Sequence, residues 1–229
     1  EYRAELTRTF PQAANGRYLT DKRPDNFQLV GLIKRLFPDA KIIHTLRDPM
    51  DTGLSVFTQH LNLRVAGYSA DLGDIGHYYG QYRRLMAHWK SLYGDDILDF
   101  DYDAFVREPR PALEKLLAFL GLDWDDACLQ FHTQANTVKT ASYWQVRQPL
   151  NTKASGRWKP FGEHLAPLRS ALREAEAKQA EEQAFADRSL FEGQGKAGAG
   201  HGRIEHRRSF AAINRRQRAQ HAHRRQRHP

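Results

Sequence analysis

A cation and a hydroxyl flank the break in the segment IIHTLRDPMDTGLSVF, residues 42–57, and together they could bind an anion. Arg47 follows an apolar run, and Ser55 lies seven residues beyond Asp48, about two helical turns. A guanidinium presents fork-shaped donors to a phosphate, and a helix N-terminus favours negative charge. The spacing therefore indicates an anion site, with a surface ion pair between Arg47 and Asp48 as the alternative.

These side chains require a strand before Arg47 and a helix after it. The nearly continuous apolar run AKIIHTL predicts a central parallel strand that is buried on both faces. Asp48 as N-cap and Pro49 at the first helical position predict a helix that continues to about His60. Arg47 would then lie at the carboxyl end of a strand, where α/β sheets bind ligands.

The surrounding elements alternate between strand and helix. The predicted strands are Tyr18–Lys22, Lys41–Leu46 and Ile97–Asp101. Helical periodicity and stop signals also predict three helices: one in NFQLVGLIKRLF, one from about Ile75 to Tyr93, and one in EPRPALEKLLAFLGL. This order indicates an α/β fold with a largely parallel sheet.

The 229 residues divide by composition into a body, residues 1–176, and a tail, residues 177–229. The tail is rich in Gly, Arg, Gln and His and carries most of the formal net charge of +8. Such a composition predicts disorder, because little apolar surface is available to offset the entropy of ordering. An alternative function for the tail is nonspecific contact with nucleic acid phosphates.

Several classes of site are not supported by the sequence. Cys128 is the single cysteine, so no internal disulfide forms, and the histidines lack the i, i+4 pairing that would suggest a metal site. No apolar run approaches the length needed to span a bilayer, and no secretory signal is visible. We therefore expect a cytoplasmic protein without a bound metal.

Three stretches in the same order resemble sulfotransferases that use 3′-phosphoadenosine 5′-phosphosulfate (PAPS). They are TDKRPDNFQLVGLIKRLFPDAKIIHTLRDPMDTGLSVF, DFDYDAFVREPRPALEKLLAFLGLDWD and SYWQVRQPLNTKASGRWKPF, and they span about residues 16–170. The resemblance is greatest to the bacterial branch similar to tyrosylprotein sulfotransferases, which is often fused to tetratricopeptide repeats. It implies a P-loop-NTPase-like sulfotransferase fold.

The resemblance also assigns cofactor-binding residues. It implies that Arg47 and Ser55 hold the 3′-phosphate of PAPS, and that Tyr102 contacts the adenosine side. Arg157 and Lys159, in the sequence GRWK, would close over the nucleotide phosphates. Without the resemblance, Tyr102 could equally be a half-buried aromatic residue at a strand end.

Lys22 and Ser142 match positions that stabilise the transferring sulfuryl group in tyrosylprotein sulfotransferases. Lys22 could alternatively be a solvent-exposed loop lysine. The chain departs from the family before Asp21, where no phosphate-binding loop of the form GxxxxGK[ST] occurs. We therefore expect the first strand and the phosphosulfate loop to be missing, together with the general base.

Three functions follow from these observations. The first is a PAPS-dependent sulfotransferase that acts on a hydroxyl or amine acceptor, with 3′-phosphoadenosine 5′-phosphate (PAP) as product. The second is a related P-loop-type protein that binds nucleotides or transfers phosphoryl groups. The third is a non-catalytic binding protein whose basic tail contacts nucleic acid.

Overall fold

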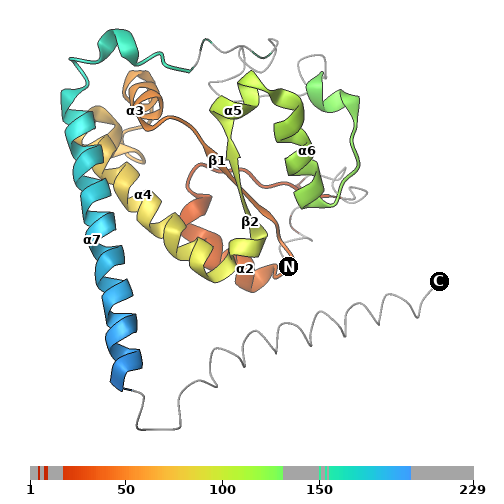
Figure 1. Ribbon diagram of the computed structural model, residues 1–229. Coiled ribbons are helices and arrows are strands. Elements are labelled where there is room, and N and C mark those ends of the chain that lie inside the picture. The colour runs from red at the N-terminus through yellow and green to blue at the C-terminus, as the bar shows by residue number, and fades with distance from the viewer. Residues whose placement is uncertain are drawn as a thin grey trace. The chain divides into compact units, whose positions relative to one another are not determined.

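The computed structural model describes residues 5, 8, 9, 18–130, 150, 153 and 155–196, with side chains to residue 185. The chain forms two units, Glu1–Lys178 and Gln179–Pro229, and the elements that position the candidate site belong to the first. Figure 1 labels the main helices and strands. In chain order the elements are η2 (Asn26–Leu29), α2 (Val30–Leu36), β1 (Ile42–Leu46), α3 (Pro49–Thr58), η3 (Gly67–Ala70), α4 (Leu72–Tyr93), η4 (Gly94–Asp96), β2 (Ile97–Asp101), α5 (Tyr102–Arg107), α6 (Pro109–Leu120), η5 (Asp126–Leu129), η9 (Lys159–Phe161) and α7 (Ala166–Lys196).

Strands β1 and β2 pair in parallel, which confirms the predicted α/β fold with parallel strands. Their register sets Ile42 opposite Ile97 and Leu46 opposite Asp101. Helix α4, which precedes β2 in the chain, supplies Met86 to a core cluster with Val30 of α2 and Ile97 of β2. Helices α2 and α4 therefore pack against the same face of the strand pair.

A polar pair joins the two strands close to their centre. His44 and Asp99 are register partners, and the Nδ1 of His44 lies 2.7 Å from a carboxylate oxygen of Asp99. Burial lowers the pKa of His44, and the smaller opposing effect of the Asp99 carboxylate does not reverse this. Lys90 of α4 reaches the other oxygen of Asp99 at 2.5 Å. These contacts link the strand register to α4.

Two sequence predictions about strands are wrong. Residues 18–23 form no strand, and Tyr18 and Leu19 are about half exposed, so little burial compensates for ordering this segment as a strand. Strand β1 is not buried on both faces, because Ile43 is 42% exposed. In the described part of the chain the sheet has only two strands, which leaves β1 at an edge.

The predicted tail also requires a correction. Helix α7 continues to Lys196, so residues 177–196 are helical rather than irregular. The segment REAEAKQAEEQ consists of residues with high helix propensity, which explains why the helix continues without a large apolar face. Residues 197–229 lie outside the described residues, and their predicted disorder stays a prediction.

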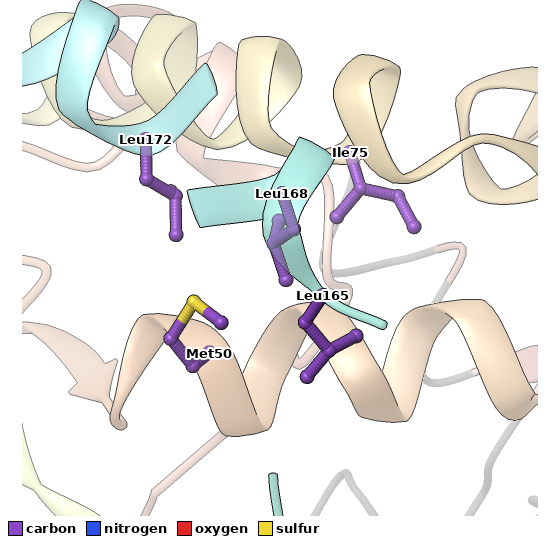
Figure 2. Packing of buried hydrophobic residues seen from close by; sticks show 5 residues of the cluster. All are labelled: Met50, Ile75, Leu165, Leu168 and Leu172. Carbon is purple, nitrogen blue, oxygen red and sulfur yellow. The ribbon is translucent and has the colours of Figure 1, made fainter. Parts of the chain in front are cut away.

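A second core cluster joins α3, α4 and the start of α7. Figure 2 shows its five buried residues: Met50 of α3, Ile75 of α4, Leu165 just before α7, and Leu168 and Leu172 of α7. Leu168 is completely buried, and Trp158 packs against the same cluster. This cluster fixes the chain just beyond residue 158 against the helix that follows β1.

We predict that Leu168→Ala lowers the free energy of unfolding by about 2–5 kcal/mol, because it removes buried methyl groups and leaves a cavity. Denaturant unfolding followed by circular dichroism measures this change. The control is Leu92→Ala in α4, because Leu92 is 56% exposed and should change stability little. Equal losses in the two variants would contradict the assignment of Leu168 to the core.

Candidate functional site

The paired ends of β1 and β2 bring Arg47 and Tyr102 together. Each residue directly follows one member of the register pair Leu46 and Asp101. The guanidinium carbon of Arg47 lies 5.8 Å from the centre of the Tyr102 ring, within the range of a cation–π contact. Parallel pairing thus places these two predicted site residues side by side, although 55 residues separate them along the chain.

The N-terminus of α3 is capped as the sequence predicts. Pro49 is the first helical residue, and the Asp48 carboxylate accepts a hydrogen bond from the backbone N–H of Asp51 at 2.9 Å. The N–H of Asp48 itself donates to a carboxylate oxygen of Asp103 at 2.8 Å. Because carboxylates already engage these donors, an anion beside Arg47 would be held mainly by side chains rather than by helix amides.

Asp51 joins the first turn of α3 to a segment more than a hundred residues away. Its side chain is buried, with only 2% of the residue exposed. One carboxylate oxygen accepts a hydrogen bond from Gly156 N–H at 2.5 Å, and the other accepts from Trp158 N–H at 3.0 Å. Both oxygens of a buried charge are therefore paired, which offsets the cost of removing it from water.

Asp103, in the first turn of α5, joins the same segment to the end of β2. Its carboxylate accepts hydrogen bonds from the Ser155 hydroxyl and from the N–H of Asp48. Burial alone would raise the pKa of Asp103. These hydrogen bonds and the positive charges of Arg47 and Arg107 outweigh that effect, so the pKa of Asp103 is lowered. Asp103 is therefore an anion that ties three segments together.

The segment from Ser155 to Lys159 turns sharply between these contacts. Gly156 has φ of +78°, a conformation that residues with a side chain rarely adopt. Trp158 packs against the second core cluster, and the guanidinium of Arg169 lies 5.8 Å from its ring centre. The predicted cofactor-binding residues Arg157 and Lys159 are exposed on either side of the anchored Trp158. The backbone of this turn is thus fixed while its two cations face solvent.

Ser55 lies on α3 four residues after Asp51 and is half-buried. Residues four apart share a face of a helix, so Ser55 lies one turn along the face that holds Gly156 and Trp158. The structure therefore connects the elements of four predicted cofactor-binding positions, Arg47, Tyr102, Arg157 and Lys159, and places Ser55 on the same helix face as their common anchor.

The two predicted catalytic residues are not joined to this arrangement. Lys22 is exposed on a segment without regular secondary structure before η2, and Ser142 lies outside the described residues. Their predicted roles remain predictions.

Asp51, Asp103 and Ser155 were not predicted from the sequence. Asp51 has the pattern of an ordinary acidic residue in the first turn of a helix, a position that favours negative charge by itself. Its partner Gly156 lies 105 residues later, and no local spacing indicates such a contact. The one available signal was Gly156 itself, since a glycine before Arg-Trp-Lys permits a sharp turn.

Two further observations concern cofactors and membranes. Within the described ranges, no group of three or more His, Cys, Asp or Glu side chains is arranged to hold a metal ion. The helices of the described part include none that is long and apolar enough to cross a bilayer.

Comparison with known proteins identifies the family. The model of the sulfotransferase family matches residues 2–126, more than half of the chain, and the chain belongs to this family. The fold is also that of a solved structure, the sulfotransferase domain from the curacin biosynthetic pathway. That comparison has a TM-score of 0.55 at 15% identity and covers 77% of this chain and 67% of the other.

Three curated relatives extend this result. An uncharacterized protein of Aquifex aeolicus is 35% identical over 68% of this chain. The protein-tyrosine sulfotransferase of Drosophila melanogaster is 26% identical over 61% of the chain, and protein-tyrosine sulfotransferase 1 of Danio rerio is 27% identical over 62%. The chain spans 21%, 30% and 41% of the lengths of these three relatives, respectively.

We predict that Gly156→Ala destabilises the protein by about 1–2 kcal/mol, because a methyl group is disfavoured at φ of +78°. The added carbon would also lie 3.3 Å from the side chain of Lys159. Thermal and denaturant unfolding measure the loss. Gly67→Ala is the control, since a methyl group there meets no atom within 4 Å and the backbone is not left-handed. Unchanged stability of Gly156→Ala would contradict the observed turn.

Proposed function

We propose that this chain forms part of a PAPS-dependent sulfotransferase that moves a sulfuryl group to a hydroxyl or amine acceptor. The proposal rests chiefly on the meeting of Arg47, Tyr102 and the segment 155–159 at the carboxyl ends of two parallel strands. Ligands of α/β proteins bind at this edge. Membership of the sulfotransferase family and the protein-tyrosine sulfotransferase relatives support the same activity.

The charges at this edge fit a nucleotide that carries more than one phosphate. Arg47, Arg157 and Lys159 supply three cations. The carboxylates of Asp48, Asp51 and Asp103 also lie here, and each already accepts hydrogen bonds from the chain itself. Their negative charge is therefore partly compensated by internal donors, which reduces their repulsion of a phosphate near the cations.

Each predicted cofactor-binding residue has a role that suits its chemistry. Arg47 would offer two parallel N–H donors to the 3′-phosphate, and the Ser55 hydroxyl would donate a third. Tyr102 would hold the Arg47 guanidinium by its ring face and border the adenosine side. Arg157 and Lys159 would bind phosphate oxygens from the turn 155–159. This distribution explains why a 3′-phosphorylated nucleotide would be preferred.

PAPS supplies an activated sulfuryl group whose departure leaves negative charge on a phosphate. Lys22 and Ser142 are the residues that we assign to stabilising this charge, through an ammonium group and a hydroxyl. A positioned cation accelerates transfer when it binds the developing charge more strongly than the ground state. The acceptor would be a molecule that carries a hydroxyl or an amine group.

We predict that the protein binds PAP more tightly than AMP, and that Arg47→Ala removes most of this preference. Loss of a charge-assisted, bidentate contact costs roughly 1.5–3 kcal/mol, or about 10- to 150-fold in affinity for PAP. Ser55→Ala should cost less, because it removes one neutral donor. Isothermal titration calorimetry of each variant with PAP and with AMP measures the preference directly.

The control is Arg110→Ala on α6, because the Arg110 guanidinium pairs with Glu114 and the side chain is 60% exposed. It removes the same charge from the protein but should leave the preference unchanged. Equal affinity of the wild type for PAP and AMP would reject the 3′-phosphate site. It would also return the phosphoryl-transfer alternative to consideration.

A further inference from the structure

The carboxylates of Asp51 and Asp103 anchor the turn 155–159, and they also determine where the residues of the turn lie. Asp51 accepts hydrogen bonds from the N–H groups of Gly156 and Trp158, the residues on both sides of Arg157. The Cα position of Arg157 is therefore set from both sides by a single buried carboxylate on α3. The exposed Arg157 side chain extends from a backbone that cannot shift without breaking these bonds.

The same turn is held at a second point. Ser155 donates its hydroxyl to Asp103, which also accepts the N–H of Asp48, the residue after Arg47. Asp103 therefore links the position of the turn to that of the residue next to Arg47. Lys159 is tied to the same turn, because its backbone N–H donates a hydrogen bond to the Gly156 carbonyl oxygen at 3.2 Å.

We propose that Asp51 and Asp103 are positioning residues that hold Arg157 and Lys159 against the nucleotide phosphates bound by Arg47. The inference rests on the proposed function, but it concerns residues that would not touch the nucleotide. A cation that is placed in advance loses less conformational freedom on binding than one on a mobile loop. The two carboxylates would therefore raise nucleotide affinity indirectly, through the turn.

Asp51→Asn is the most direct variant, because asparagine keeps the shape but replaces one acceptor by a donor. That NH₂ group would face a backbone N–H, and one of the two bonds would be lost. We expect the affinity for PAP to fall by roughly tenfold, approaching the loss caused by Arg157→Ala. Asp71→Asn is the control, since Asp71 caps α4 by accepting two backbone N–H groups on a single exposed carboxylate oxygen, which asparagine can retain.

A double-mutant cycle separates positioning from a general loss of stability. If Asp51 acts through Arg157, then Asp51→Asn should cost little further affinity in a protein that already carries Arg157→Ala. Calorimetry with PAP measures all four proteins, and circular dichroism establishes that each is folded. Additive losses, or full PAP affinity in Asp51→Asn, would overturn the inference while leaving the proposed function intact.

Two other outcomes are informative. A wild type that does not prefer PAP over AMP rejects the proposed function, and this inference with it, before any variant is compared. If Asp51→Asn does not fold, Ser155→Ala provides the same test through Asp103, since it removes only the hydroxyl contact. We expect Ser155→Ala to weaken PAP binding by a few fold and to be non-additive with Arg157→Ala. Unchanged affinity would overturn the positioning role.

Discussion

The candidate site depends on two anionic side chains that accept hydrogen bonds from distant parts of the chain. Asp51 receives two backbone N–H groups from the turn after residue 155, and Asp103 receives the Ser155 hydroxyl and the N–H of Asp48. A buried carboxylate is tolerated only when such donors compensate it. The need to satisfy the buried charge of Asp51, together with the contacts of Asp103, therefore holds the turn near the carboxyl ends of β1 and β2.

Apolar packing and strand pairing hold the same segments in place. Trp158 and Leu168 anchor the chain on either side of η9 to the cluster that contains Met50 of α3. The parallel register of β1 and β2, with His44 opposite Asp99, places Arg47 and Tyr102 side by side directly after the paired strand ends. Apolar packing thus brings α3 and the turn close together, and the carboxylates define their final positions.

Local sequence patterns were sufficient for the individual elements near the site. The apolar run before Arg47, the N-cap Asp48 and Pro49 predicted a strand and a helix that the structure confirms. Tyr18–Lys22 has a similar strand-like composition but remains exposed, because strand formation depends on a partner that composition cannot reveal. The contact between Asp51 and Gly156 could not be predicted either, because no local sequence pattern links two residues so far apart in the chain.

A crystal structure of the protein with PAP tests the central claim most directly. We expect 3′-phosphate oxygens within about 2.7–3.2 Å of the Arg47 guanidinium and the Ser55 hydroxyl. The N–H groups of Gly156 and Trp158 should stay hydrogen-bonded to Asp51, so that only the side chains of the turn reach the nucleotide. A phosphate that binds those N–H groups in place of Asp51, or that binds away from Arg47, would contradict the account.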